Sequence, residues 1–309
     1  MAAVAPNTER TTVVDRLVTF EPRFEHIDAL ASVIVDRRGA ADEAAVAIAV
    51  MDGDGVRGRV VTGPLPGVLA IGRHPACDLH LRQADASMRH ALVVADDDGV
   101  RIVDLSSSFG LAGRAVAKAG IWATVRAGDS VIAAALLRPG EPLGDVSALH
   151  AVWRPDLPRG VARPRTNRMR VLDIDDVAAI LPAPSPVART PQVIRGDRGS
   201  ITVTEIDAPV LIGRDTRCGV RVEDNSAHIS RVHAALIPVR VRGERQLVLV
   251  DVGSTNGTEV LQASAGGIRE VALGPVGRGQ VVGEGDIVEL AGNVRLRLVG
   301  RRGDGQGHG

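Results

Sequence analysis

The chain has 309 residues, 45% of them hydrophobic, and its 37 Lys and Arg residues balance its 37 Asp and Glu residues. This balance creates no long-range field that would steer the protein to nucleic acid. Three Phe, two Trp and no Tyr also leave few rings for stacking on unpaired bases. We therefore expect no nucleic-acid partner, and the length suits two domains of about one hundred residues each, with connecting segments.

The N-terminal region, residues 1–42, combines a polar tail with a short predicted helix. Residues 1–21 are polar, and we expect them to be flexible. The apolar stripe that follows would pack on the neighbouring domain or dock a partner, and the sequence leaves both readings open. After Pro22 the apolar side chains recur at the spacing of an amphipathic helix, at Phe24, Ile27, Leu30, Ala31 and Ile34.

No segment is apolar over a length that could cross a membrane. Residues 1–16 lack the apolar core of a signal peptide, and the longest apolar runs are Ala44–Met51 and Val131–Leu137. Both are far shorter than the roughly 20 residues that a spanning helix needs. We expect a cytoplasmic protein that does not insert into membranes.

Residues 43–139 predict the first domain, an all-β sandwich. Short Val-, Ile- and Leu-rich runs follow one another, each bounded by Gly, Pro, Asp or Ser, which is typical of such folds. Abundant Val favours strands because β-branched side chains fit a pleated surface. The predicted strands are Val46–Met51, Arg59–Thr62, Val68–Ile71, Leu79–Leu81, His90–Val94, Val100–Asp104, Ala123–Val125 and Ser130–Leu137.

Residues 140–192 predict a Pro- and Arg-rich linker, and residues 193–300 a second all-β domain. Nine of the seventeen prolines lie between Pro139 and Pro191, which favours an extended chain. The Arg-rich stretch 159–170 either stays solvated or contacts an acidic partner. Residues 301–309 form a glycine-rich tail that we expect to be disordered. Predicted strands of the second domain are Ser200–Glu205, Val210–Ile212, Val220–Val222, His233–Val241, Gln246–Asp251, Glu270–Leu273, Val281–Val282, Asp286–Leu290 and Val294–Val299, with a further one around Val260.

Four short motifs occur twice, in the same order, once in each predicted domain. Ordered repetition of this kind indicates a tandem repeat. Gly213 lies 141 residues after Gly72, and Gly285 lies 157 residues after Gly128, so the second copy has longer loops. The matched segments are 72–77 with 213–218, 87–91 with 230–234, 104–110 with 251–257, and 128–131 with 285–288.

The second copy carries the residue types that a phosphate group needs. A phosphate monoester is close to doubly negative at neutral pH, so it is bound by several cations together with hydroxyl and amide donors. Three loops, each beside a predicted strand, supply two arginines, two hydroxyls and one carboxamide. These residues are Arg214, Ser230, Arg231, Thr255 and Asn256.

The order and spacing of these residues resemble the forkhead-associated (FHA) domain, a phosphothreonine reader, and in particular bacterial, actinobacterial-like members. The resemblance implies two FHA-type β-sandwiches whose loops bind peptide at one end. Arg214 would hold the peptide backbone, and Arg231 would supply the second cation. Ser230 and Thr255 would donate hydroxyls to phosphate, while Asn256 would pair with the peptide main chain.

By the same resemblance, further residues support these loops, and the first copy retains only part of the site. The supporting residues of the second copy are Gly213, His233, Asp251 and Gly257. Of the first copy's counterparts, Arg73, Ser87 and Ser108 remain. Met88 replaces the second cation and Phe109 the carboxamide, so we expect weak or absent phosphate binding there. Arg89, one residue further on, is an alternative source of the cation.

Other classes of function fit the sequence less well. Ser230, His233 and Asp251 are the residue types of a hydrolase triad, but no Gly-x-Ser-x-Gly turn surrounds the serine, so we expect no enzyme. The histidines are too far apart in the sequence to predict a metal site. The sequence contains no nucleotide-binding motif, so we expect no cofactor. Cys77 and Cys218 occupy equivalent positions, which favours two buried apolar residues over a disulfide between domains.

The predicted function is that of an adaptor in Ser/Thr kinase signalling, bound through the second domain to phosphothreonine-containing proteins such as a kinase or its substrates. The alternative is a phosphate-independent scaffold that uses the divergent first domain. A self-ligand is a further hypothesis, because Thr11 and Thr12 lie in the N-terminal tail and Thr190 in the linker.

Overall fold

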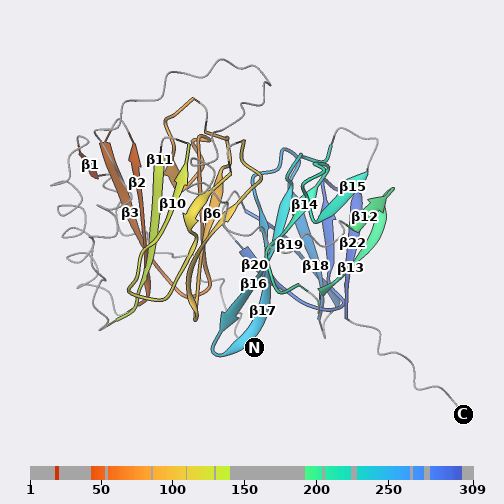
Figure 1. The fold of residues 1–309 in the computed structure, drawn as a ribbon. Coiled ribbons are helices and arrows are strands. Elements are labelled where there is room, and N and C mark those ends of the chain that lie inside the picture. Colours follow the sequence, from red (N-terminus) through yellow and green to blue (C-terminus); the bar gives the residue numbers. More distant parts are fainter. Residues whose placement is uncertain are drawn as a thin grey trace, which may run out of the picture.

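The computed structural model describes residues 18–20, 43–52, 55–84, 86–108, 110–128, 130–139, 192–203, 206–223, 228–264, 267–274 and 279–300. The regular elements there are strands, arranged as two β-sandwiches (Figure 1). The all-β prediction is confirmed. The predicted N-terminal helix, the linker apart from Gln192, the C-terminal tail and the three candidate self-ligand threonines lie outside the described residues.

The first sandwich consists of two sheets in which nearly all neighbouring strands are antiparallel. One sheet contains, in spatial order, β1 (Val18–Phe20), β3 (Gly55–Thr62), β2 (Ala45–Asp52), β11 (Ser130–Leu137), β10 (Ala123–Ala127) and β8 (Ala112–Arg114). The other contains β5 (Leu79–His80), β4 (Gly67–Gly72), β6 (Ala91–Asp96), β7 (Gly99–Asp104) and β9 (Val116–Ala117).

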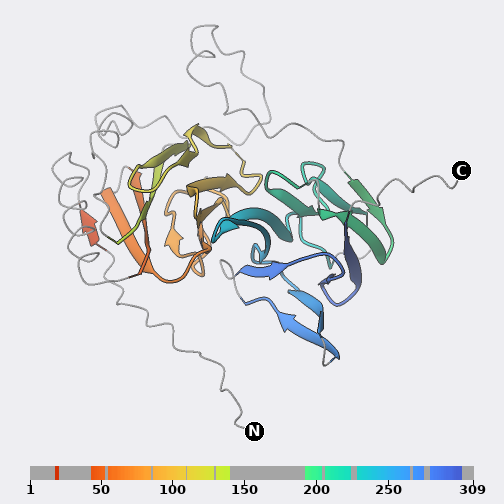
Figure 2. The ribbon, with the colours of Figure 1, turned by 90° about the horizontal axis from the view of Figure 1, so that it is seen from below.

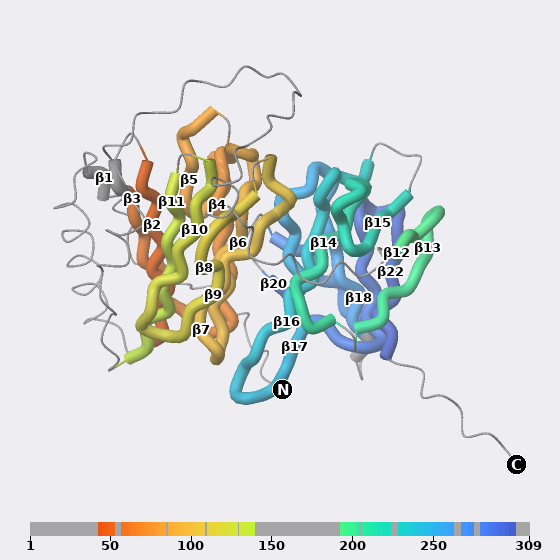
Figure 3. Tube along the Cα trace, in the orientation of Figure 1, coloured from red at the N-terminus to blue at the C-terminus, as the bar shows by residue number. Residues whose placement is uncertain are grey.

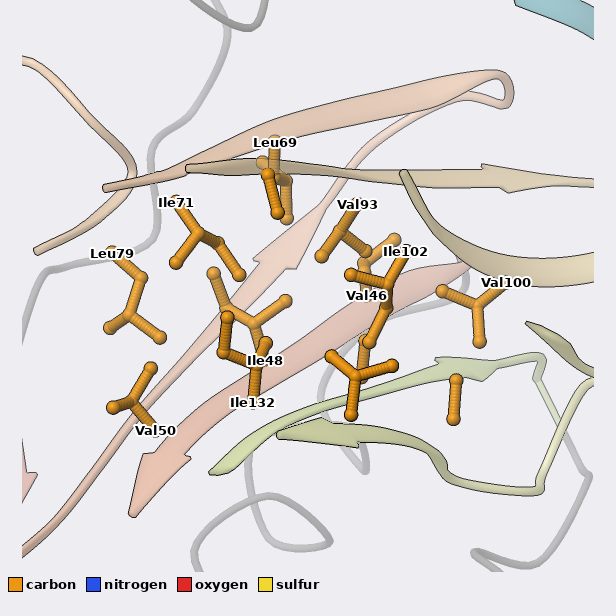
Figure 4. Packing of buried hydrophobic residues seen from close by; sticks show 14 of the residues in the cluster. Val46, Ile48, Val50, Leu69, Ile71, Leu79, Val93, Val100, Ile102 and Ile132 are labelled. Atoms are coloured by element: carbon orange, nitrogen blue, oxygen red, sulfur yellow. The ribbon is translucent and has the colours of Figure 1, made fainter. Parts of the chain in front are cut away.

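Alternate side chains of these two sheets meet in the core of the first sandwich. Figure 4 shows Ile48 and Val50 of β2 on one side of this core and Ile71 of β4 on the other. Because side chains alternate between the faces of a strand, the residues between them point away from this core. In β2 and β11 that second face is also buried, which explains why both strands read as unbroken apolar runs.

β1 corrects the prediction that residues 1–21 form a flexible tail. Val18, Thr19 and Phe20 pair antiparallel with Gly58, Arg57 and Val56 of β3. Valine, threonine and phenylalanine all favour strands, and β3 offers them the open edge of its sheet. The polar character of the surrounding tail hid this three-residue strand.

The second sandwich has the same plan, with longer hairpins. One sheet contains, in spatial order, β12 (Gln192–Arg195), β15 (Val220–Glu223), β14 (Val210–Gly213), β16 (Ala234–Val241), β17 (Glu244–Asp251) and β20 (Gly279–Val282). The other contains β13 (Arg198–Thr202), β22 (Val294–Val299), β21 (Ile287–Leu290), β18 (Thr258–Ser264) and β19 (Gly267–Ala272). The inward faces of the two sheets close over an aliphatic core that includes Ile212, Leu236, Leu249 and Leu296.

The two sandwiches pack against each other through one sheet each, so the domains share an apolar core. Figures 2 and 3 show β16 and β17 of the second domain beside β6 of the first. All six residues of β6 are buried, because one face lines its own sandwich and the other faces the second domain. The shared core contains Val68, Ala70, Cys77, Leu92, Val94 and Leu105 from the first domain, and Ala235, Ile237, Val239, Val248, Val250 and Val252 from the second.

Hydrogen bonds between two hairpin turns fix the relative direction of the domains. The Asp97 amide, just after β6, donates to the carbonyl of Arg240 near the end of β16 (2.9 Å). The Gly243 amide donates to the Asp97 carboxylate (3.0 Å), and the Arg240 amide donates to Asp96 (3.2 Å). β6 and β16 therefore end at the same end of the interface. The loops that precede them lie together at the opposite end.

Candidate functional site

Two loops of the second domain are joined by close backbone contacts. Arg214 donates its backbone amide to the Ser230 carbonyl (3.2 Å), and Asp215 donates to the Arg231 carbonyl (3.0 Å). A Cβ added at Gly213 would lie 2.2 Å from the Arg231 oxygen. Such an approach is open only to a residue without a side chain. Glycine at position 213 therefore places Arg214 beside Ser230 and Arg231.

A third loop, which carries Thr255 and Asn256, is held beside the first two by side-chain hydrogen bonds. We call the exposed edge formed by these three loops the rim of the second domain. The Thr255 amide donates to the Ser230 hydroxyl (3.2 Å). The Asn256 carboxamide donates through Nδ2 to the His228 carbonyl (2.8 Å). The structure thus brings together the loops that carry the predicted binding residues. Four of these residues are exposed and Ser230 is half-buried; the set is Arg214, Ser230, Arg231, Thr255 and Asn256.

Asp251 holds the third loop in shape. Its carboxylate accepts the amides of Gly253 and Ser254 (both 2.6 Å) and the hydroxyls of Ser254 and Thr258 (both 2.7 Å). The loop ends at Gly257, whose φ of +83° lies in the left-handed region that favours glycine. A buried carboxylate with four donors is fully satisfied, so Asp251 acts on geometry and offers nothing to a ligand.

His233 is buried beneath the rim and connects the second loop, at Ser230, to the third loop, at Gly257. Its Nδ1 accepts the Ser230 amide (3.1 Å), and its Nε2 lies 2.9 Å from the Gly257 carbonyl. This pairing requires a proton on Nε2 and a lone pair on Nδ1, which is the neutral ring. Burial lowers the pKa of His233 below its usual value, against a smaller opposing effect of the hydrogen bond to Gly257. The imidazole is a buried support for the rim.

The two arginines of the rim keep their hydrogen-bonding capacity. Among the described residues, neither the Arg214 nor the Arg231 guanidinium makes a hydrogen bond or an ion pair. Arg217, in contrast, binds Asp215 through two nitrogens (both 3.0 Å). These bonds are the main cause that lowers the pKa of Asp215 to about 2, and the nearby Arg231 contributes a smaller part. Two uncommitted cations on one exposed rim suit an anionic ligand.

The first domain repeats three of the bonds that join these loops. Arg73 donates its amide to the Ser87 carbonyl (3.0 Å), and Ser87 donates its amide to His90 Nδ1 (3.3 Å). The Ser108 amide donates to the Ser87 hydroxyl (3.2 Å), as Thr255 does to Ser230. A Cβ at Gly72 would lie 2.4 Å from the Met88 carbonyl oxygen. The three residues retained by sequence therefore meet on an equivalent rim.

The exposed chemistry of the first rim differs from that of the second. Arg73 Nε donates to the Ala86 carbonyl (3.1 Å), so part of its guanidinium is committed to the protein. Met88, where the second domain has Arg231, is 41% exposed and presents a thioether. Arg89 does not take the place of the missing cation, since its guanidinium lies against Gly253 of the second domain. Phe109 lies outside the described residues.

Some residues of the site were not predicted. Ser254 accepts the Gly257 amide (2.9 Å) as well as bonding Asp251, and the His228 carbonyl holds Asn256. A serine two residues before an Asn-Gly pair is a common signal for a side chain that closes a turn. The His228 contact is made by a backbone atom and leaves no such signal.

The described segments show neither a group of residues that could hold a metal ion nor a helix long and apolar enough to span a bilayer. Cys77 and Cys218 are free and buried. Burial raises the pKa of the Cys77 thiol to about 11 and that of Cys218 to about 12. Each thiol lies near the carbonyl of the second loop in its domain, Met88 or Arg231. Both cysteines are unreactive packing residues.

The family model for the FHA domain matches residues 69–114 and 210–291. A comparison with curated proteins found no match. Among solved structures, the chain is similar to the FHA domain of FhaA complexed with the intracellular domain of Rv3910, with 24% identity and a TM-score of 0.23, over 29% of this chain and 98% of that one.

Two further structures are similar over short stretches. One is the FHA domain of CT664 from Chlamydia trachomatis, with 20% identity and a TM-score of 0.24, over 30% of this chain and 96% of that one. The other is EmbR from Mycobacterium tuberculosis in complex with a low-affinity phosphopeptide, with 21% identity and a TM-score of 0.24, over 37% of this chain and 30% of that one. The second match contains all four repeated motifs of its domain, and the first contains the first three motifs of its own. These two matches support a tandem FHA-domain protein.

Proposed function

We propose that this protein is a non-catalytic adaptor that binds phosphothreonine peptides at the exposed rim of its second FHA domain. One observation carries the proposal: Arg214 and Arg231 lie on hydrogen-bonded loops around Ser230, and within the described segments neither guanidinium has a protein acceptor. FHA domains belong to the modules that recognise phosphorylated motifs through arginines. In the first domain, the rim has one cation fewer and its Arg73 is partly engaged.

The hydrogen-bond pattern supports a direct role for Ser230 in phosphate binding. Its oxygen accepts the Thr255 amide, which fixes the hydroxyl in place and leaves its proton available. A hydroxyl donates one hydrogen bond while it accepts others, so Ser230 can donate to a phosphate oxygen without losing its support. Charge-assisted bonds of this type are shorter and stronger than neutral ones.

Asn256 is suited to hold the peptide main chain. One hydrogen of its carboxamide is used on the His228 carbonyl, which orients the group. The second N–H and the carbonyl oxygen stay available, and together they can pair with one peptide N–H and one C=O. Peptide binding through Asn256 would fix the register of the ligand, whereas the arginines and hydroxyls recognise its phosphate.

The arrangement around Ser230 favours binding over catalysis. In a serine hydrolase the histidine accepts the proton of the serine hydroxyl. Here His233 Nδ1 accepts the Ser230 backbone amide instead, and Nε2 faces the Gly257 carbonyl. No imidazole nitrogen is left to activate the hydroxyl. The proposed partners are phosphothreonine-containing proteins, such as a Ser/Thr kinase or its substrates, and a cytoplasmic location stays a prediction.

Fluorescence anisotropy with the full chain and a degenerate phosphothreonine peptide library tests the proposal. We expect micromolar binding of phosphorylated peptides, negligible binding of the unphosphorylated library, and a loss of at least about thirtyfold in Arg214→Ala, as one to two charged hydrogen bonds imply. Arg245→Ala removes an exposed arginine from β17, away from the rim, and should bind as the wild type does. Equal binding of both libraries would instead favour the phosphate-independent scaffold.

A further inference from the structure

We infer that Arg89 of the first domain positions the phosphopeptide loop of the second domain, so that the two domains build one site together. This inference rests on the proposed function of the second rim. Arg89 takes the position that Val232 occupies in the second domain, and Val232 packs against the core shared by the domains. The residue at this position therefore faces the other domain and not the ligand rim of its own.

The guanidinium of Arg89 lies directly on the backbone of Gly253. A Cβ at Gly253 would be 1.9 Å from Arg89 Nε, 2.5 Å from Cζ and 2.6 Å from Nη2. The φ of Gly253 is +85°, so both its conformation and its neighbour require glycine. The guanidinium can occupy this position because glycine has no Cβ there.

Gly253 is the start of the loop that presents Thr255 and Asn256. Its amide is held by Asp251, and the Arg89 guanidinium fills the space where a side chain of residue 253 would lie. The loop is therefore clamped between a carboxylate of its own domain and a guanidinium of the neighbouring domain. Loss of Arg89 would free the covered side of this clamp and let the loop move away from Ser230.

The charge of Arg89 is available to act on the rim. Its Nε is buried and has no hydrogen-bond partner within the described part of the chain. A buried donor without an acceptor is unfavourable, so packing on Gly253 must hold it there. A dianion bound close to this loop would be attracted by a cation in a partly desolvated position, where screening by salt is reduced.

A charge of the first domain also acts on the other side of the rim. Arg217 belongs to the loop that begins at Gly213. Its pKa is raised mainly by the bonds to Asp215, and the carboxylate of Asp104 in the first domain adds to this effect. The charge of the first domain thus reaches the first loop of the second rim, in addition to the contact through the shared apolar core.

The test compares Arg89→Ala with Arg245→Ala, both in the full chain, by two measurements. The first is the Kd for the tightest phosphothreonine peptide of the library. We expect a loss of roughly tenfold in Arg89→Ala and no change in Arg245→Ala, which removes an exposed arginine of β17 away from the rim. The second is amide hydrogen exchange without ligand, which should become severalfold faster at residues 252–257 in Arg89→Ala alone.

A double variant tests whether the effect passes through Gly253. Gly253→Ala places a methyl group where the guanidinium lies, so it should displace Arg89. Adding Arg89→Ala to Gly253→Ala should then change the Kd by much less than tenfold, whereas a full additional tenfold loss would overturn the contact as the route.

The outcomes separate this inference from the proposed function. If the wild type binds phosphopeptide and Arg89→Ala matches it in both measurements, the inference is wrong while the proposed function stands. If no phosphopeptide binds the wild type, the proposed function fails, and the exchange rates at 252–257 still decide whether Arg89 positions the loop. A rise in exchange across the whole second domain, equal in core strands and loop, would show general destabilisation and would also overturn it.

Discussion

The two FHA domains share the same hydrogen-bond framework but present different side chains on it. In each, a histidine Nδ1 holds the amide of a serine, and that serine's hydroxyl holds the third loop. On this framework the second domain places Arg231, where the first has an exposed Met88. The bonds that shape the loops join backbone amides to the same serine and histidine side chains in both domains, whereas the exposed side chains that would meet a ligand differ.

The first domain supports the second domain by packing against it. Its sheet β5-β4-β6-β7-β9 packs on the second domain's sheet β12-β15-β14-β16-β17-β20. In addition, Arg89 lies against Gly253 in the third loop of the second rim. A domain that has lost part of its binding chemistry can still be required, because removing it would expose a contiguous apolar face. In the proposed account, the second domain binds the phosphopeptide and the first domain supports it.

The largest effect is expected from a charge in the shared core. Ile237 is fully buried between the domains, and Ile237→Asp would bury a carboxylate with no partner, at a cost of about 3–5 kcal/mol. Thermal unfolding of the full chain should show a Tm lower by roughly 10 °C. Ile268→Asp is the matched control, since Ile268 is 76% exposed on β19. Equal Tm values for the two variants would mean that the domains do not depend on each other.

Restoring the missing groups would make the domains alike. Met88→Arg together with Phe109→Asn supplies the second cation and the carboxamide, and two such contacts correspond to a gain on the order of a hundredfold. Isothermal titration calorimetry should change from one phosphopeptide per chain to two. If the stoichiometry stays at one, Met88 and Phe109 are not the reason that the first rim fails to bind phosphopeptide.

The converse change should make the second rim resemble the first. Arg231→Met removes one cation and keeps a side chain of similar length, so we expect phosphopeptide binding to weaken by about 10- to 100-fold. The Tm should stay within about 2 °C of the wild type, because Arg231 is exposed and unpaired in the described structure. An unchanged Kd would show that the second arginine is not part of the site.

A smaller effect concerns pH and the support beneath the rim. Burial lowers the pKa of His233, so the unfolded chain binds its proton more readily than the folded one does. Stability is therefore complete above about pH 6.5 and falls as the pH drops below it, by at most about 1.4 kcal/mol per pH unit from this group. Urea unfolding at pH 7.5, 6.5 and 5.5 should show a steeper loss for the wild type than for His233→Gln. Parallel curves would contradict this assignment.

Much of the fold could be predicted because its strands are short aliphatic runs between turn residues. The strands that the sequence did not reveal are β1, β8, β9 and β12, which have two to four residues each and lie at sheet edges. β12 pairs in parallel with β15, far along the chain, so no hairpin signal marks it. Such strands depend on the partner edge more than on their own composition.

The candidate site was predictable as a set of residues but not as an assembly of two domains. Repeated motifs located Arg214, Ser230 and Asn256, because their order along the chain survives without coordinates. The placement of Arg89 against Gly253 depends on how the two sandwiches pack together. No local sequence pattern predicts that packing. One signal was available: β6 and β16 contain unbroken apolar runs rather than alternation, which indicates strands buried on both faces.

The central claim is that phosphothreonine is read at one rim only, that of the second domain. Chemical-shift mapping of the isotopically labelled full chain, titrated with a phosphothreonine peptide, tests it most directly. We predict perturbed amides at residues 213–218, 228–233 and 252–257, with residues 73–77 and 105–108 unchanged. Shifts centred on the Arg73, Ser87 and Ser108 loops, or spread over neither rim, would contradict the account.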